Sequence, residues 1–154
     1  MGIKSFMGKR VKPNKRSSEQ IIVSDYMTKK LIVFSPDQSV LEVMNVLIKH
    51  KISGGPVVNE NQELVGIISE GDCIKQISDS RYYNQPMENI SVEEHMATDV
   101  DTIDGDMNVF DAAEKFLKSK HRRFPILEDG KLVGQISQKD ILKAALDLKG
   151  HSWK

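Results

Sequence analysis

One pair of residues that could take part in ligand chemistry occurs twice in this sequence, as a serine and an aspartate three positions apart. The first pair is Ser69 and Asp72 in LVGIISEGDCIK, and the second is Ser137 and Asp140 in LVGQISQKDILK. In both copies an apolar run typical of a strand leads into a helical pattern, so a hydroxyl, a carboxylate and free backbone N–H groups meet at a strand-to-helix junction. Such a junction suits a phosphorylated sugar, because helix N-terminal N–H groups attract phosphate and a carboxylate accepts hydrogen bonds from ribose hydroxyls.

The elements that must position the two junctions are also repeated. Ser39 is the expected N-cap of a helix, with Glu42 completing a capping box, and Asn108 is the expected N-cap of its counterpart. Apolar residues at helical spacing predict one stripe on each helix. The stripes are Val40, Val43, Met44, Leu47 and Ile48 in the first helix, and Val109, Ala112, Ala113, Phe116 and Leu117 in the second.

Short strands and a final helix complete each repeat. The pattern predicts strands at 31–34 and 100–103, and a proline-led strand at 56–58 and 125–127 that turns back at 64–68 and 132–136. The last helix is expected to begin at each motif aspartate. The side chains expected to face inward are Ile74 and Ile77 in the first repeat, and Ile141, Leu142 and Ala145 in the second.

Each repeat therefore reads strand, helix, strand, strand, helix, which predicts an α+β fold. A unit of this size buries little apolar surface alone, so the two sheets are expected to pack together about a pseudo-twofold axis. The expected divisions are a basic N-terminal tail at 1–20, repeat 1 at 21–78, a connector at 79–91, repeat 2 at 92–148 and a C-terminal tail at 149–154.

The composition of the chain sets limits on its function. The 154 residues carry 22 basic and 22 acidic side chains, so no overall field favours nucleic acid or a membrane. Cys73 is the only cysteine, which excludes an internal disulfide. No apolar run reaches the ~20 residues of a membrane span, and no secretory signal begins the chain, so a cytoplasmic location is expected.

The repeated motifs together resemble a tandem pair of CBS domains, called a Bateman module, over about residues 21–148. The resemblance rests on paired segments: Met27-Thr28 and Met96-Ala97, SPDQSV and DGDMNV, SGGPVV and RRFPIL, and above all GIISEGD and GQISQKD. It implies a stand-alone ligand-sensing module, two such pairs associating into a homodimer, and adenosine-containing ligands in the cleft between the repeats. AMP is the expected ligand, with ADP and ATP as further members of the class.

The resemblance also implies roles for particular residues. The motif aspartate would hold the ribose diol, and the motif serine would help to hold phosphate. The pockets would be crossed, with the junction of one repeat facing the segment before the proline of the other. One pocket would use Ser69, Gly71 and Asp72 with Thr102, His121, Arg122 and Arg123. The other would use Ser137, Lys139 and Asp140 with Val33, Ile52, Ser53 and Gly54.

The two implied pockets differ in charge. The first contains Arg122 and Arg123, and guanidinium groups bind oxyanions through two hydrogen bonds. The second contains Lys139 and has Gly54 where the first has Arg123, so it is expected to prefer adenosine or to stay empty.

Simpler readings of these residues remain open from the sequence. Asp72 and Asp140 could only stabilise helix N-termini, worth about 0.5 kcal/mol each. Cys73 takes the place of Ile141 and is expected to be a core residue. The four histidines form no metal-ligand pattern, and no catalytic constellation is present, so neither a metal nor a cofactor nor catalysis is expected.

The expected function is therefore a non-enzymatic regulatory module that passes nucleotide occupancy to an unidentified regulated protein. The alternative is an interaction or nucleic-acid-associated protein that uses the basic arm at 1–20, with a vestigial cleft. An enzyme that acts on the nucleotide is the third possibility.

Overall fold

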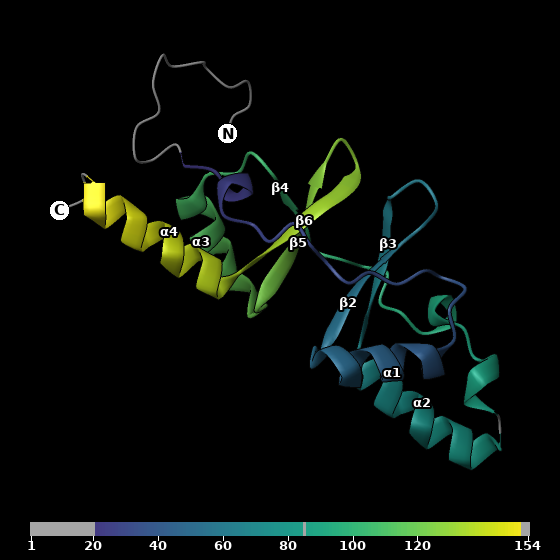
Figure 1. Cartoon of the computed structure of the whole chain (residues 1–154). Coiled ribbons are helices and arrows are strands. Elements are labelled where there is room, and N and C mark those ends of the chain that lie inside the picture. Colours follow the sequence, from purple (N-terminus) through teal and green to yellow (C-terminus); the bar gives the residue numbers. More distant parts are fainter. Residues whose placement is uncertain (1–20, 85, 152–154) are drawn as a thin grey trace.

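The computed structural model describes residues 21–84 and 86–151, so both the basic tail at 1–20 and the last three residues lie outside the described part. Along the sequence, the first part of the chain contains η2 (Val23–Asp25), α1 (Val40–His50), β2 (Gly54–Val58), β3 (Leu64–Ser69) and α2 (Glu70–Tyr83). The second part contains η3 (Met87–Asn89), η4 (Val92–Glu94), β4 (Ile103–Asp104), α3 (Val109–Ser119), β5 (Arg123–Glu128), β6 (Lys131–Ser137) and α4 (Gln138–His151). In space the chain forms two halves, the first around α1, α2, β2 and β3 and the second around α3, α4 and β4 to β6 (Figure 1).

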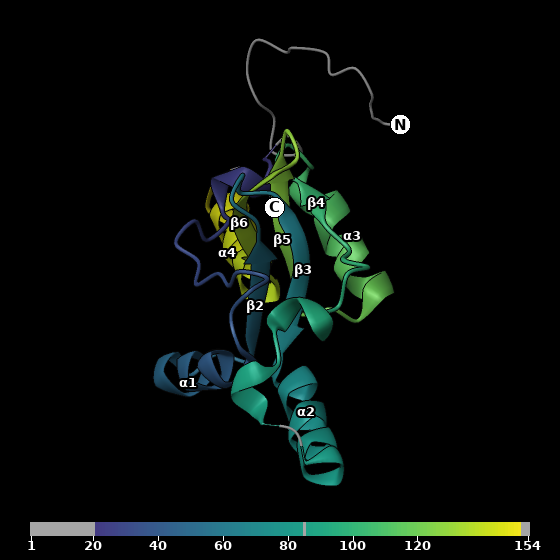
Figure 2. The same cartoon turned by 90° about the vertical axis from the view of Figure 1, so that its right-hand side faces the viewer.

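Two small sheets meet in the middle of the molecule, and the helices lie toward its two ends. Strands β2 and β3 form an antiparallel pair, while β4 runs parallel to β5 and β5 antiparallel to β6. Helices α1 and α2 lie at one end, and α3 and α4 at the other (Figures 1 and 2). The predicted α+β fold of two repeated units packed through their sheets is confirmed.

The first strand of each repeat is shorter than predicted. In place of a strand at 31–34, Phe34 alone bridges Val57, and in place of 100–103 the strand is Ile103–Asp104. Val33 is 41% exposed, so the segment before Phe34 is not held in a sheet along its length. Phe34 is held because its N–H donates to the Pro56 carbonyl at 2.9 Å and its ring lies against Gly55.

The expected caps of α1 and α3 are present. The Glu42 N–H donates to Ser39 Oγ at 3.1 Å and the Ser39 N–H to Glu42 Oε1 at 3.2 Å, which completes the capping box. Asn108 accepts from the Phe110 N–H at 2.7 Å. The last stripe residue of each helix was placed wrongly, however, since Ile48 is 78% and Leu117 84% exposed.

The inward face of α2 and α4 also differs from the prediction. Helix α2 begins at Glu70, and over residues 70–81 its buried side chains are Cys73 and Gln76, whereas Ile74 and Ile77 are exposed. In α4, Ala144 and Leu148 are buried, Leu142 is exposed, and Ile141 and Ala145 are half-buried. The motif aspartates hydrogen-bond to the preceding serines, and these bonds fix the rotation of each helix about its axis. With this rotation, residues 74 and 142 face outward. No helix among residues 21–84 and 86–151 is long and apolar enough to cross a membrane.

The opening turn of each repeat packs on the other half of the molecule. Val23, at the start of the chain's first repeat, is fully buried in the core of the second half, together with Ile103, Phe124 and Ile136. Thr28 pairs with Gln135 of β6 through hydrogen bonds of 2.8 and 3.0 Å. The first opening turn is thus part of the second half's core.

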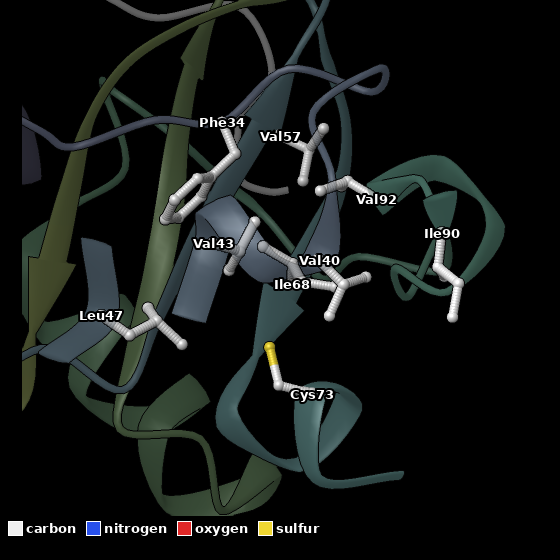
Figure 3. Close-up of a cluster of buried hydrophobic side chains, with 9 residues drawn as sticks. All are labelled: Phe34, Val40, Val43, Leu47, Val57, Ile68, Cys73, Ile90 and Val92. Atoms are coloured by element: carbon white, nitrogen blue, oxygen red, sulfur yellow. The ribbon is translucent and has the colours of Figure 1, made fainter. Parts of the chain in front are cut away.

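The second opening turn makes the reciprocal contacts. Ile90 and Val92 are buried among Phe34, Val40 and Ile68 in the core of the first half (Figure 3). Ala97 pairs with Ile67 of β3 at 2.8 and 2.9 Å. Each half is therefore completed by a segment that the sequence repeat assigns to the other half.

The two sets of exchanged contacts are related by the repeat itself. In the repeat, Thr28 is equivalent to Ala97 and Gln135 to Ile67, so the Thr28–Gln135 bridge corresponds to the Ala97–Ile67 bridge. In the same way the Ile22–Asn108 bridge corresponds to Ser91–Ser39. The same backbone hydrogen bonds recur from one half to the other, as in Val23 N–H to the Met107 carbonyl and Val92 N–H to the Gln38 carbonyl. This reciprocity is the pseudo-twofold symmetry of the pair.

A side-chain hydrogen bond reinforces each exchanged turn. The Tyr26 hydroxyl donates to Asp147 Oδ2 of α4 at 2.7 Å, and His95 Nδ1 lies 2.7 Å from Gln76 Nε2 of α2. The hydrogen bond to Asp147, followed by burial, raises the pKa of Tyr26 to about 12. Both turns are thus tied to the helix that follows a Ser/Asp junction.

Gly66 should be a sensitive position because an exchanged segment lies directly over it. A Cβ there would meet Met96 Sδ at 2.5 Å and the Ala97 carbonyl oxygen at 2.8 Å. Gly66→Ala is therefore expected to lower the free energy of unfolding by about 1–3 kcal/mol, as overpacking does. Urea unfolding would measure this, with Gly71→Ala as the control, since a Cβ at Gly71 meets only Ser69 Oγ at 3.7 Å. Equal stability of the two variants would contradict the tight packing described.

Candidate functional site

The two Ser/Asp junctions have nearly the same geometry. At the first, Asp72 Oδ2 accepts from the Ser69 N–H at 2.9 Å and from Ser69 Oγ at 3.0 Å, while the Asp72 N–H points to Ser69 Oγ at 3.3 Å. At the second, Asp140 Oδ2 makes the equivalent bonds to Ser137 at 2.8 and 3.0 Å, with the returning bond at 3.3 Å. The serine is therefore the N-cap of the helix, and the aspartate is its third residue.

This geometry shows that the aspartates stabilise their helices. The hydrogen bonds that the described residues make to the two carboxylates use Oδ2 and not Oδ1. Asp140 is 8% exposed, so its orientation is held firmly. The cap fixes the carboxylate at the helix N-terminus, where N–H donors also attract phosphate.

Each junction lies beside the segment before the proline of its own repeat. Gly54 pairs with Ser69, and the Glu70 N–H donates to the Ser53 carbonyl at 2.8 Å. Arg123 pairs with Ser137 in the same way, and the Gln138 N–H donates to the Arg122 carbonyl at 3.2 Å. The antiparallel hairpin causes this pairing, because it brings the start of its first strand beside the end of its second. The crossed arrangement between the repeats that the resemblance implied stays a prediction.

The segment before each short strand joins the same grouping. A Cβ at Gly55 would lie 3.0 Å from the Ile32 carbonyl oxygen, so the stretch that holds Val33 runs beside the Ser53-Gly54 segment. Thr102 precedes β4, which pairs with β5 at Ile103 and Ile126. The predicted residues thus fall into two sets, each within one repeat. The first is Val33, Ile52, Ser53, Gly54, Ser69, Gly71 and Asp72, and the second is Thr102, His121, Arg122, Arg123, Ser137, Lys139 and Asp140.

The second set includes charged neighbours that sequence reasoning missed. Lys115 Nζ of α3 lies 2.9 Å from Asp101 Oδ1 and donates to the Thr102 carbonyl at 2.9 Å. His121 Nε2 lies 3.9 Å from Asp101 Oδ2, and its ring packs edge-on against Phe124. The signal was present in the repeat, because Asp101 and Lys115 stand where the first repeat has Ile32 and Val46.

Other candidate chemistry is not supported by the structure. Cys73 is buried in the first core, and burial followed by the charges of Asp72 and Glu70 raises the pKa of its thiol, which favours the unreactive neutral form. Among the described residues, His, Cys, Asp and Glu side chains form no group of three or more that could hold a metal ion.

Comparison with known proteins points to one family. The family model for the CBS domain matches residues 23–79 and again residues 92–147. The chain is 32% identical to the CBS domain-containing protein CBSX1 of Arabidopsis thaliana, with 82% of this chain and 65% of that protein covered. It is 30% identical to the uncharacterised protein MJ1426 of Methanocaldococcus jannaschii, with 84% and 94% covered. The chain thus spans slightly less than two thirds of the length of CBSX1.

Solved structures show the same architecture. The crystal structure of CBSX2 in complex with AMP superposes with a TM-score of 0.71 at 30% identity, covering 83% of this chain and 98% of that one. The CBS domain pair of protein MJ0100, solved with 5-methylthioadenosine and S-adenosyl-L-methionine, superposes with a TM-score of 0.66 at 29% identity, covering 82% and 97%.

Proposed function

This chain belongs to the CBS domain family as a tandem pair of domains, and from that premise we propose that it is a regulatory module that binds adenine nucleotides. The observation that carries the proposal is the doubled junction. In each copy an N-capping serine, a carboxylate and helix N–H donors lie beside the segment before a proline. The AMP complex of the similar protein CBSX2 supports the same ligand class. AMP is the expected nucleotide.

Both matched regions are CBS domains, and stand-alone CBS pairs are regulatory rather than catalytic. The similarity to an enzyme covers only a small part of that enzyme. The chain is 34% identical to inosine-5'-monophosphate dehydrogenase of Methanocaldococcus jannaschii but covers 26% of its length. The expected output is therefore a change of contacts with a regulated protein. A ligand can produce that change only if it binds one arrangement of the pair better than another.

We further propose that the two junctions prefer different ligands of the adenosine class. The second junction, at Asp140, has two exposed guanidinium groups on the adjoining segment, which suits a phosphate. The first junction, at Asp72, has Ser53 and Gly54 in their place and suits adenosine without phosphate. A Cβ at Gly54 would lie 2.7 Å from the Ile68 carbonyl oxygen, so this segment has little room for an arginine.

Nucleotide binding should be measurable as heat and as added stability. Calorimetric titration with AMP, ADP, ATP and S-adenosylmethionine is expected to show binding for at least AMP. Ligand at about 100 times its dissociation constant should raise the free energy of unfolding by about 2.7 kcal/mol, with a higher melting temperature. A dissociation constant of ~1 mM corresponds to a binding free energy of about 4 kcal/mol. If none of the four ligands gives heat at ~1 mM, the proposal fails.

Homodimer formation is a separate prediction about the same module. Ile48 and Leu117 occupy equivalent positions on α1 and α3 and are almost fully exposed, and Ile74, Leu142 and Leu146 add exposed apolar surface on α2 and α4. Apolar surface of this kind is typical of an interface. Light scattering is expected to give twice the chain mass of 17.4 kDa, and Leu117→Glu should reduce it to one chain. A wild-type mass of one chain, with and without AMP, would contradict the prediction.

A further inference from the structure

The side chains around the two Ser/Asp junctions differ in charge, although the backbones of the junctions match. Around the second junction stand Asp101, Lys115 and His121, and the Lys115 ammonium group and a His121 ring nitrogen each lie within 4 Å of the Asp101 carboxylate. At the equivalent positions around the first junction stand Ile32, Val46 and Ile52, which pack against the first apolar core. A charged cluster has thus replaced an apolar one at the site that also carries the arginines.

Lys115 is the centre of this cluster. Its ammonium group lies 2.9 Å from the Asp101 carboxylate, 2.9 Å from the Thr102 carbonyl oxygen and 5.2 Å from the centre of the Phe124 ring. Its side chain is 29% exposed, so water screens these contacts only in part. Lys115 therefore links the 101–102 segment to Phe124 of β5, the residue that follows Arg123.

We propose that Lys115 is a positioning residue that lets the second junction accept a phosphorylated adenosine, by neutralising Asp101 and holding the Thr102 backbone in place. The proposal rests on the function proposed above, since it concerns the ligand of the same site. Asp101 alone would place a negative charge 3.9 Å from His121, next to the Arg122-Arg123 segment that would meet the anion. Lys115 cancels that charge, so the guanidinium groups of Arg122 and Arg123 remain available to the phosphate.

The electrostatic consequence is specific for the ligand's charge. An unbalanced carboxylate in a half-exposed site repels a phosphate a few ångströms away by about 1 kcal/mol, which is several-fold to tenfold in affinity, but it acts little on neutral adenosine. A purely structural loss would instead weaken both ligands alike. The ratio of AMP to adenosine affinity therefore separates the two roles.

The test uses the full chain with three variants. Lys115→Met removes the charge but keeps an unbranched apolar side chain. Val46 occupies the equivalent position in α1, so an apolar residue is compatible with this place in the repeat. Asp101→Asn combined with Lys115→Met removes both charges. Lys118→Met is the matched control, because Lys118 forms an ion pair with Glu114 at 3.3 Å on the exposed side of the same helix.

AMP affinity is measured by calorimetry, and adenosine affinity by competition against bound AMP, so both values refer to the same site. Lys115→Met is expected to weaken AMP about tenfold and adenosine less than about threefold, and the loss for AMP should shrink at high salt. The double variant should regain most of the AMP affinity, and Lys118→Met should match the wild type.

Three results would overturn the inference: unchanged AMP affinity in Lys115→Met, equal losses for AMP and adenosine, or a double variant as weak as the single one. If the wild type binds AMP normally in these titrations, any of them removes only the role of Lys115. If the wild type binds no adenosine ligand, the proposed function fails and this inference fails with it.

Discussion

Arg123→Ala should weaken AMP binding by roughly 10- to 100-fold, because a charge-assisted hydrogen bond to phosphate is worth about 1.5–3 kcal/mol. The side chain is exposed and borders the second junction, where Arg123 pairs with Ser137. Its removal should leave the melting temperature of the free protein nearly unchanged. Arg81→Ala is the matched control, since Arg81 is exposed in the last turn of α2, at the end away from the junction.

The same titration tests which aspartate serves the phosphorylated ligand. The crossed arrangement implied by the resemblance places Asp72 with the arginines and therefore predicts the larger AMP loss for Asp72→Ala. With the hairpin geometry, Asp140→Ala should cause the larger loss. Since Asp140 also caps α4, the variant is expected to lose about 1 kcal/mol of stability, which a melting curve would report separately. A larger AMP loss in Asp72→Ala would support the crossed arrangement instead.

Neither half of the chain should fold alone. A fragment of residues 1–85 lacks Ile90 and Val92, which are buried in its core, and its own Val23 loses the core in which it is buried. Deleting a buried aliphatic side chain typically costs about 2–5 kcal/mol, so losing two of them removes most of the stability of a small domain. Circular dichroism melting of this fragment is expected to show no cooperative transition.

Mixing the two fragments provides the control for this result. Residues 1–85 and 86–154 together contain both exchanged turns, so the mixture is expected to recover a cooperative transition and, under the proposed function, a response to AMP. A cooperative transition in the 1–85 fragment by itself would show that the exchanged turn contributes little to the first core. The Gly66→Ala variant examines the same contact in the intact chain.

Local features of the fold could be predicted from the sequence because their causes lie within a few residues. The capping box at Ser39 was predicted, since it needs only a hydroxyl and a carboxylate three positions later. The same spacing forms the caps at Ser69 and Ser137, although those helices were expected to begin at the aspartates and instead begin two residues earlier. The helical spacing of Val40, Val43 and Leu47 placed the buried face of α1 correctly. The exposed ends of the stripes could not be predicted, because Ile48 and Leu117 are as apolar as their buried neighbours, and only the position of the second helix decides which side chains are covered.

The sequence by itself determined that the chain is a repeated unit with two equivalent Ser/Asp junctions. Tertiary structure decided which core receives each opening turn. Val23 and Val92 hold equivalent places in two similar units, so the local pattern is the same whether a turn packs on its own half or on the other. Tertiary structure also decided which charges surround each junction, because antiparallel pairing joins residues far apart in the sequence, such as Arg123 and Ser137. Asp101 and Lys115 meet for the same reason: their contact depends on how α3 lies against the strands, and the spacing of residues along the chain does not specify that position.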